Sequence, residues 1–427
     1  MKRSSGHSRK SRHTKELRRR RRKSARRRAA ESPVLRALTT SILALPGLAG
    51  SASADSPPET VQADYNYAHY SEDDISGGKL APGSQGQRYE IDIHQIRMLV
   101  PVAERWDVGL DIAYETMTGA TPWYIEPEAG TNRPLQVMTG ATINDTRTDV
   151  LASTNYYLTN GKVGGTLGVS VENDYLAVNG GLSGERHLRE KTTTISGGTG
   201  FSIDRLTPKD ADIFTERPEE EDKQSWNLSG GISQILGQST QVQSSLTYQL
   251  GLGFLSDPYK RSTVAGTPLA DRRPDQRHQF AWLTRFRHRL DGLDGSLHAD
   301  YNFYLDDWGI TGHTFEAAWH QSLFDLIRLV PSIRYYTQSQ ADFYAPFYTS
   351  ARSDNLRSSD YRLSPYGALS YRIKTEARFQ TWNIDWIASF GYERYTSSAD
   401  LAISKVSIEN PGLVSFNLFS VGLEGRY

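Results

Sequence analysis

The chain has 427 residues, with 23 Tyr, 8 Trp, 36 Gly and no Cys, which excludes a disulfide framework and a Cys-ligated metal site. Its formal charge of zero hides a segregation of charge: residues 1–54 hold 16 of the 49 basic residues and two of the 49 acidic ones, which leaves 33 basic and 47 acidic residues, a formal charge of −14, in 55–427. An acidic body argues against nucleic acid as the partner, because phosphate binding needs a basic surface.

The first 54 residues have the order of a secretory signal. A basic segment that includes the run Arg18 to Lys23 precedes a short, mostly apolar stretch, Leu35 to Gly50, and then three small residues, 52–54. The apolar stretch is shorter than the roughly 20 residues that a membrane helix needs. We therefore expect a basic leader and a cleavable signal peptide over 1–54, cut after Ala54. The order of these segments disfavours the alternative, a basic arm that binds nucleic acid.

Apolar and polar residues alternate in segments of about ten residues through the rest of the chain. In the clearest segment, Trp106 and Val108 fall on one face while Asp107 and Asp111 fall on the other. Successive side chains of a strand point to opposite faces, so this alternation predicts strands. We expect sixteen of them, near residues 61–70, 89–100, 106–116, 146–158, 162–172, 175–186, 190–203, 225–237, 240–254, 277–290, 296–307, 312–323, 328–339, 362–373, 379–396 and 412–427.

The connections between these strands broadly alternate in length. Short turns are expected near 102–105, 159–161, 237–239, 291–295, 325–327 and 374–377, and long polar loops over 71–88, 117–145, 204–224, 255–276, 340–361 and 397–411. Short periplasmic turns and long outer loops are typical of outer-membrane barrels. We therefore expect an all-β chain whose residues 55–427 form a transmembrane antiparallel up-and-down β-barrel of about 16 strands, integral to the bacterial outer membrane and surrounded by its lipid and lipopolysaccharide. The alternative, a soluble propeller or sandwich, lacks support from any blade-length repeat.

Charged residues on the predicted inner face are the candidates for lining a pore: Glu90, Asp92, Asp107, Asp111, Glu115, Arg285, Arg287, Arg289 and Asp300. Opposed acidic and basic walls are typical of porin constrictions, where they orient polar solutes. Alternatively these charges pair with neighbours and brace the barrel. Arg287 is expected to lie across the 291–295 turn from Asp300 or His298, close enough to pair. The sequence leaves both interpretations open.

The motifs of common catalytic sites are missing from the sequence. It contains no HExxH pattern, no G-x-S-x-G elbow and no phosphate loop. We expect no catalytic residues, no metal site and no cofactor, and we keep an outer-membrane hydrolase as a less favoured alternative. Acidic clusters at 72–74 and 219–222 could bind divalent cations shared with lipopolysaccharide, but solvated loop charge is the favoured interpretation.

Short motifs occur in a distinctive order along the body of the chain. They are Tyr65-Asn-Tyr67 before Glu72-Asp-Asp-Ile75, Tyr89 to His94, Thr118 to Trp123, Leu255 to Lys260, and then Arg272-Arg-Pro274 with Arg277. With these motifs the chain, over roughly 61–427, resembles an uncharacterised family of bacterial outer-membrane proteins, the domain of unknown function 3570. The resemblance implies a β-barrel. It also implies a role in an envelope redox system, because the genes of such proteins are expected beside those of a small lipoprotein, a thioredoxin-like protein and a flavin-transferring enzyme.

Two of these motifs begin predicted outer loops and supply further candidates: Trp123, Asp257, Tyr259, Lys260, Arg272, Arg273 and Arg277. They could fold inward and narrow the mouth. The favoured interpretation is structural, with Pro and Gly turning the chain and Trp123 anchored at the lipid interface.

The chain ends on a predicted strand, in which Phe419, Val421 and Leu423 share a face with the last residue, Tyr427. This strand resembles the terminal strand through which the barrel-assembly machinery recognises outer-membrane barrels. We expect a porin-like channel for small hydrophilic solutes. The alternatives are a scaffold barrel that supports a periplasmic redox or lipoprotein partner and, less favoured, the hydrolase.

Overall fold

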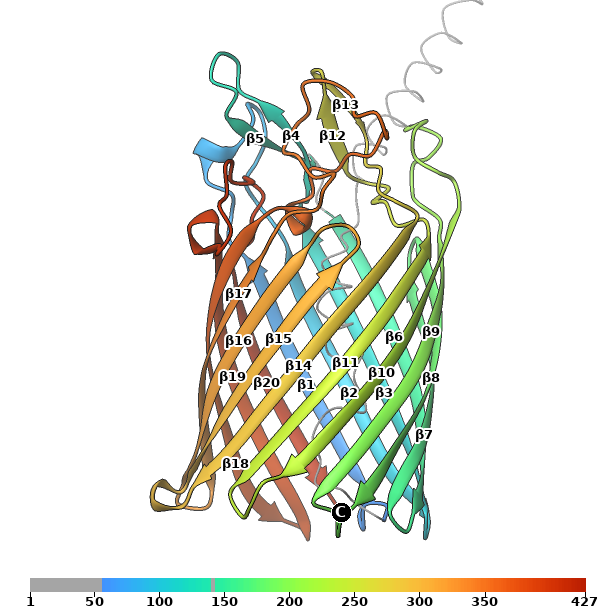
Figure 1. Ribbon diagram of the computed structural model, residues 1–427, viewed down its shortest axis with the longest axis vertical. Helices are drawn as coiled ribbons and strands as arrows, with labels where there is room; N and C mark the ends of the chain where they lie inside the picture. The colour runs from blue at the N-terminus through green and yellow to red at the C-terminus, as the bar shows by residue number, and fades with distance from the viewer. Residues whose placement is uncertain (1–55, 140–142) are drawn as a thin grey trace, which may run out of the picture.

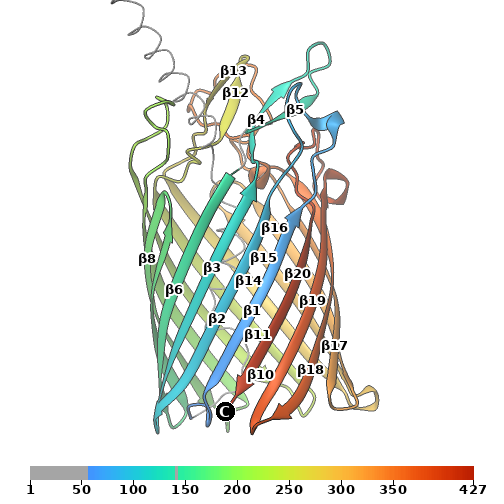
Figure 2. The ribbon, with the colours of Figure 1, turned by 180° about the vertical axis from the view of Figure 1, so that it is seen from behind.

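The computed structural model describes residues 56–139 and 143–427, and within them it forms a closed barrel of sixteen antiparallel strands. Each strand is hydrogen-bonded to the next along the barrel, and β1 closes the ring by pairing with β20 (Figures 1 and 2). The predicted leader and cleavage site lie outside the described residues. The barrel strands are β1 (Gln62–Glu72), β2 (Glu90–Ala103), β3 (Trp106–Gly119), β6 (Ile143–Leu158), β7 (Gly161–Glu172), β8 (Tyr175–Leu188), β9 (Thr193–Leu206), β10 (Glu221–Ile235), β11 (Thr240–Gly253), β14 (Gln276–Leu290), β15 (Gly295–Asp306), β16 (Thr311–Leu323), β17 (Ile327–Gln338), β18 (Tyr366–Thr381), β19 (Ile384–Ser398) and β20 (Phe416–Arg426).

All sixteen predicted strands are confirmed, but the predicted turn at 374–377 is wrong. Those residues lie inside β18, and the chain reverses at Trp382 and Asn383. Lys374 and Glu376 resemble turn residues in the sequence because both are polar. They face the inside of the barrel, where Lys374 Nζ lies 2.8 Å from Glu376 Oε1 and Glu376 Oε2 lies 3.5 Å from Arg328 Nη1.

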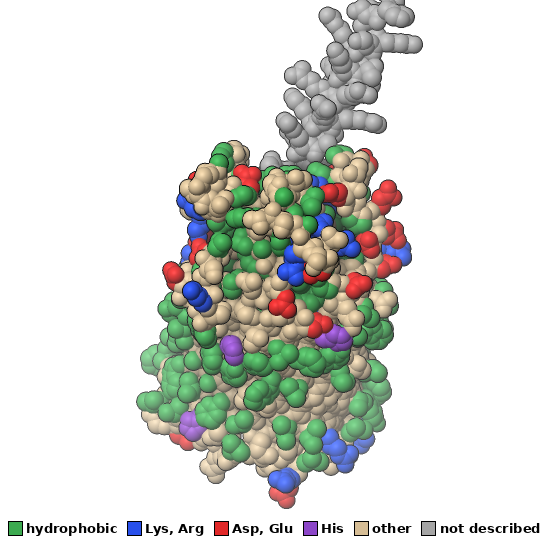
Figure 3. All heavy atoms as spheres, turned by 45° about the horizontal axis from the view of Figure 1, so that its top comes forward, with side chains coloured by type: hydrophobic (Ala, Val, Ile, Leu, Met, Phe, Trp, Pro, Cys, Tyr) green, Lys and Arg blue, Asp and Glu red, His purple; other side chains and the backbone are tan. Residues whose placement is uncertain are grey.

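The outer surface of the barrel is apolar on alternate residues of each strand. On β7, for example, Val163, Leu167, Val169 and Val171 are all exposed, and the residues between them point into the barrel. Figure 3 shows hydrophobic side chains around the barrel wall and charged side chains gathered on the loops above it. In the described residues no helix is long and apolar enough to cross a membrane.

The two ends of the barrel differ. Short turns and the C-terminus lie at one end, and the long loops lie at the other (Figure 1). Two of the short turns place bulky residues in the left-handed backbone region, Phe324 (φ 53°) and Trp382 (φ 53°), and the following Asp325 and Asn383 also have positive φ. Trp382 and Asn383 form a two-residue hairpin, whose twist this conformation matches, whereas Phe324 and Asp325 belong to a three-residue turn; such positions normally select Asn or Gly.

The long loops contain two small hairpins, β4 (Pro122–Pro127) with β5 (Pro134–Met138) and β12 (Arg261–Val264) with β13 (Thr267–Ala270). Residues 254–275, which include β12 and β13, join residues 339–365, which include the 3-10 turn η3 (Tyr361–Leu363). Backbone bridges connect Arg272 to Arg357 and Val264 to Tyr348. We call these two segments the loop cap. An apolar cluster joins the cap to the turn after β15. It is formed by Trp308, Ile310, Ala341, Phe343, Tyr344 and Leu363.

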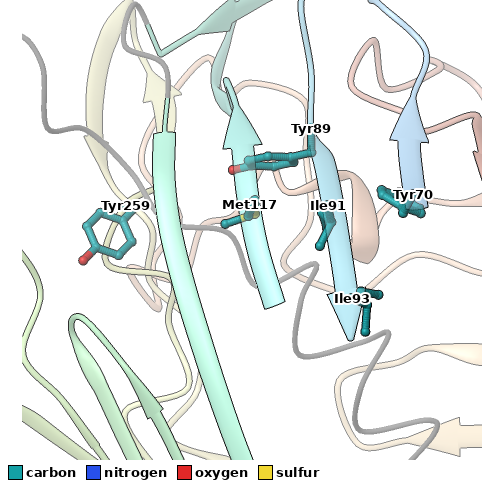
Figure 4. Close-up of a cluster of buried hydrophobic side chains, with 6 residues drawn as sticks. All are labelled: Tyr70, Tyr89, Ile91, Ile93, Met117 and Tyr259. Carbon is teal, nitrogen blue, oxygen red and sulfur yellow. The ribbon is translucent and has the colours of Figure 1, made fainter. Parts of the chain in front are cut away.

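The inside of the barrel is packed with apolar side chains at the long-loop end. Tyr70 of β1, Ile91 and Ile93 of β2 and Met117 of β3 are buried there, together with Tyr89 and Tyr259 (Figure 4). Phe416 and Leu418 of β20 pack against the same cluster. The alternation therefore inverts at this end: apolar residues point inward to a protein core, and polar residues of the same strands point outward.

Contacts between distant loops cross the seam between β1 and β20. Arg394 Nη2 lies 2.5 Å from Asp73 Oδ2, and Lys79 Nζ lies 2.5 Å from Glu409 Oε1. The backbone N–H of Asp73 donates to Ser415 O at 2.8 Å. The loop after the first strand is thus bound to the segments that flank the last one.

Candidate functional site

The inner wall of the barrel carries most of the predicted pore-lining residues, each beside a partner. Asp107 accepts hydrogen bonds from Asn155 Nδ2 at 2.8 Å and from the Tyr157 hydroxyl at 2.6 Å. Asp111 Oδ1 lies 3.4 Å from Arg97 Nε, and Glu115 lies opposite Arg147 in the β3–β6 register. Asp107, Asp111 and Glu115 thus lie on the inner face of β3, where Asp107 and Glu115 are buried.

The predicted basic wall on β14 lies beside an acid of the next strand. Arg287 Nη2 donates to Asp300 Oδ2 at 3.0 Å, and Arg285 Nε lies 3.7 Å from the same carboxylate oxygen. Arg289 lies at the short-turn end, where its Nε is 3.0 Å from Asp291 Oδ1 and its side chain is 66% exposed. The pair that the bracing interpretation requires, Arg287 with Asp300, is formed, and both side chains still reach the lumen surface.

The prediction that Glu90 and Asp92 face the lumen is wrong. Asp92 lies on the outer face, where it accepts a hydrogen bond from the Tyr67 hydroxyl at 2.6 Å and lies 2.9 Å from His69 Nδ1. Glu90 has the same parity on β2 and is also exposed. Assigning every apolar residue to the lipid face fails here because Ile91 and Ile93 belong to the inner cluster at the long-loop end.

Trp123 does not lie at a lipid-facing strand end, as the favoured structural interpretation required. It belongs to β4, above the barrel, and its ring centroid lies 6.4 Å from that of Phe214. The Arg261 guanidinium lies 5.9 Å from the Trp123 ring. Trp123 therefore packs among the loops, because Pro122 begins a hairpin there instead of a lipid-anchored turn.

The loop cap is centred on a buried carboxylate, Asp360. Arg362 Nε donates to Asp360 Oδ2 at 2.9 Å, Arg273 Nη2 donates to the same oxygen at 2.9 Å, and Lys260 Nζ lies 4.0 Å from Oδ1. Two further acids complete the group: Asp271 accepts from Arg273 Nε at 2.7 Å, and Asp257 accepts from Arg362 Nη2 at 3.2 Å. Three acids and three bases thus alternate within the cap.

Local folding places these side chains. The β12–β13 hairpin brings its two flanking residues together at its base, where the Asp271 N–H donates to Lys260 O at 3.1 Å. Asp360 is the N-cap of η3, and its side chain accepts from the backbone N–H of Arg362 at 3.2 Å. One short hairpin and one short helical turn therefore orient the acids and bases of the cap.

Burial and charge act in opposite directions on these groups. Burial alone would raise the pKa of Asp360, but the charges of Arg362, Lys260 and Arg273 outweigh it and hold that pKa well below its usual value. Burial lowers the pKa of Lys260, and it raises the pKa of Asp271 even though Arg273 acts to lower it. The cap therefore holds Asp360 ionised, whereas burial disfavours the charged forms of Lys260 and Asp271.

A second buried ion pair lies beside the cap and was not predicted. Arg88 Nε lies 2.5 Å from Glu72 Oε2, and both side chains are almost fully buried. The Tyr70 hydroxyl donates to Glu72 at 2.9 Å, and Arg88 Nη1 donates to Gly412 O at 3.0 Å. Glu72 is thus not solvated loop charge, as the sequence had suggested, because the loop that follows β1 folds back over the barrel mouth.

A cavity of about 310 Å³ lies between the loop cap and the inner faces of β10, β11 and β14. Four of the loop candidates line it: Asp257, Tyr259, Arg273 and Arg277. Arg277 Nη2 lies 2.5 Å from Asp306 Oδ2, and its guanidinium stacks over Trp308 at 4.2 Å. We call this space the cap cavity.

Two of the loop candidates, Tyr259 and Arg272, differ in how their side chains are used. The Tyr259 hydroxyl donates to Asp174 and accepts from the backbone N–H of Lys209 at 3.1 Å, so it connects the cap to two other loops. Arg272 contributes only its backbone, which is hydrogen-bonded to Arg357, and its side chain is exposed. The sequence motifs therefore predicted the part of the site that lies in residues 254–275. They did not predict Asp360, Arg362 and Trp308, which belong to no local motif.

Within residues 56–139 and 143–427 no group of three or more His, Asp or Glu side chains is arranged to hold a metal ion. The three central acids of the cap, Asp257, Asp271 and Asp360, are each engaged by arginine or lysine. The site is therefore described by its ion pairs and by the cap cavity.

Comparison with known proteins identified one family and several barrels. The family model described as "Protein of unknown function (DUF3570)" matches residues 35–406. A comparison with curated proteins found no match. Among solved structures, a bacterial polysaccharide outer membrane secretin is 11% identical, with 86% of this chain and 98% of that chain covered and a TM-score of 0.44.

Two further solved structures match the chain at similarly low sequence identity. CdiB from Acinetobacter baumannii is 9% identical, with 86% of this chain and 60% of that chain covered and a TM-score of 0.46. OccK3 (OpdO) from Pseudomonas aeruginosa is 10% identical, with 86% and 94% covered and a TM-score of 0.39. At these identities the likeness concerns the fold alone.

Proposed function

From the premise that the chain belongs to the DUF3570 family, whose function is unknown, we propose that it is an outer-membrane channel for small hydrophilic solutes. The observation that carries the proposal is the contrast between the two faces of the barrel wall. The outer face is apolar, whereas the inner face carries charged residues such as Asp107, Asp111, Arg285 and Arg287. Sixteen-stranded barrels are wide enough to leave an aqueous channel.

The loop cap gives this channel a narrow entrance. Its ion pairs hold residues 254–275 and 339–365 together over the inner faces of β10, β11 and β14. Rings of charge at a constriction tune which solutes pass. We propose that passage is limited at the cap cavity and not along the strands.

Conductance in planar lipid bilayers tests the proposal. The purified, heat-modifiable protein should give discrete conductance steps. Replacing the β12–β13 hairpin, residues 261–270, by two glycines should enlarge the steps several-fold, because it removes part of the cap together with the bridges from Val264 to Tyr348 and from Arg261 to Ser359. Shortening the exposed tip of the β4–β5 hairpin, residues 128–133, is the matched control and should leave the steps unchanged. A folded protein that stays silent both with and without the β12–β13 hairpin would refute the channel.

A scaffold barrel is the second candidate, and one observation favours it. The buried pairs Arg88–Glu72 and Arg273–Asp360 and the apolar clusters beneath the cap fill much of the outer end with protein. A barrel closed in this way would support a periplasmic partner, such as a lipoprotein or redox protein, without conducting. Silence in bilayers, together with copurification of a defined periplasmic protein, would favour this candidate over the channel.

A further inference from the structure

The wall of the cap cavity is unevenly charged at its surface. Four basic side chains line it and remain partly exposed: Lys223 (20%), Arg273 (11%), Arg277 (22%) and Arg362 (25%). The carboxylates that pair with them are at most 3% exposed: Asp204, Asp271, Asp306 and Asp360. The acids thus lie behind the bases, and the surface that a solute would meet is basic.

Two of the arginines keep an unused edge. Arg277 donates to Asp306 through Nε and Nη2, and Arg362 donates to Asp360 through the same two atoms. In the described part of the chain no hydrogen bond engages Nη1 of either side chain. A guanidinium has five N–H donors in a planar fork, so each arginine can bind an acceptor in the cavity without giving up its carboxylate.

Acidic residues also line the cavity, but they contribute little exposed charge. The Asp257 side chain is 2% exposed and accepts from Arg362, and the Glu172 side chain is 5% exposed and lies 3.7 Å from Arg147. Asp174 is buried and accepts the Tyr259 hydroxyl. None of the three offsets the basic surface formed by the four exposed side chains.

The rest of the lining includes neutral polar residues, among them Gln249 and Gln279, and a small apolar region. In that region Trp308 lies under the Arg277 guanidinium at 4.2 Å, and Phe254, Leu255 and Leu206 lie beside the same cavity. A volume of about 310 Å³ is at the lower limit of pockets that hold small organic molecules. The cavity thus offers one anion-binding region beside one apolar region.

We propose that the cap cavity binds small organic anions, with a carboxylate or phosphate group on the free edges of its arginines and the apolar part of the molecule against Trp308. This proposal rests on the proposed function, because it names the class of solute that the channel would select. Binding itself does not require conduction, so the two can fail separately.

The test measures binding of benzoate to the full folded chain in detergent by isothermal titration calorimetry. Benzamide, which has the same ring without the charge, should bind at least tenfold more weakly. In a second arm, inorganic phosphate is added. Displacement of benzoate by phosphate extends the ligand class to phosphate compounds, and lack of displacement confines it to carboxylates.

A substitution that breaks no ion pair probes the basic surface. Gln249 is exposed and lines the cavity from the inner face of β11, so Gln249→Glu adds a negative charge there and should weaken benzoate binding about tenfold. Gln241→Glu adds the same charge on the same face eight residues away, toward the short-turn end, and should change nothing.

Equal affinity for benzoate and benzamide, or an unchanged benzoate affinity in Gln249→Glu, would overturn the anion site. Bilayer measurements separate this failure from that of the channel. Benzoate binding without conductance refutes the channel alone, and conductance without benzoate binding refutes the site alone.

Discussion

Removing the charge of Asp360 should release the loop cap. The substitution Asp360→Asn keeps the shape of the side chain but leaves the buried Lys260 and the partly buried Arg362 and Arg273 without their shared carboxylate. Breaking a buried ion pair on one side costs about 3–5 kcal/mol. At 1.4 kcal/mol per tenfold change, the population of opened cap should rise roughly a hundred- to a few-thousand-fold.

Limited proteolysis measures that population. Trypsin cleavage at Lys260 and Arg261 requires the cap to open, because Lys260 is buried and the backbone of β12 is paired with β13. When opening is fast, the cleavage rate follows the opened fraction. Asp354→Asn is the matched control: Asp354 lies in the same loop and pairs with Arg352, but both side chains are well exposed, at 40% and 37%, so little change is expected.

A second variant keeps this test informative. Asp360→Asn combined with Lys260→Met removes one of the uncompensated charges without separating another ion pair, keeps the tryptic site at Arg261, and should recover part of the protection. If the cleavage rate of Asp360→Asn equals that of Asp354→Asn, the ion cluster does not hold the cap and the reasoning fails.

Four other predictions follow from the same physical arguments. The pKa of Asp360 is lowered, so its contribution to the stability of the cap is present above its unfolded value of 3.8 and is lost only at still lower pH. The pKa of Asp271 is raised, so its contribution to that stability falls as pH rises. Hydrogen exchange should therefore show the cap at least as protected at pH 4.5 as at pH 7, and acid loosening near pH 5 would contradict this. Replacing the strained residues of the two-residue turn, Trp382→Asn with Asn383→Gly, should stabilise the barrel in urea by about 1 kcal/mol, since Trp382 is 87% exposed and loses little burial; a lower midpoint would show that the aromatic has a structural partner. Arg287→Met should cost about 1 kcal/mol in the same assay and Arg289→Met nothing measurable, because only Arg287 is partly buried with its acid; equal effects would argue against bracing. Finally, a disulfide across the seam, Ser71→Cys with Asn417→Cys, joins register partners of β1 and β20 and should leave conductance unchanged; a loss would mean that the seam opens in use.

The strand order was predictable because two-residue alternation is a local signal. Segments such as β3 and β7 carry it without interruption, and the contrast between short turns and long loops followed from the same pattern. The misplaced turn in β18 shows its limit: a polar pair that faces a wet lumen, Lys374 and Glu376, has the composition of a turn. The true turn at Trp382 lacks the Asn-Gly signature.

The inner and outer faces were predictable only where lipid lies outside and water inside. At the long-loop end both conditions fail, so Ile91 and Ile93 point inward and Asp92 points outward. One half of the cap was predictable, because Asp257, Lys260 and Arg273 follow or begin recognisable motifs. Their partners were missed because Arg273 and Asp360 are separated by 87 residues, and no periodicity connects residues so far apart.

The contacts across the seam decide where a solute can leave. To pass sideways into the bilayer it would have to part β1 from β20, whose register runs from Gln62 with Arg426 to Glu72 with Phe416, and also break Asp73 from Arg394 and Lys79 from Glu409. The wall is therefore closed at this seam, and the proposed channel would pass solutes only along the long axis of the barrel. The same contacts join segments from opposite ends of the sequence, at the place where the first strand meets the last.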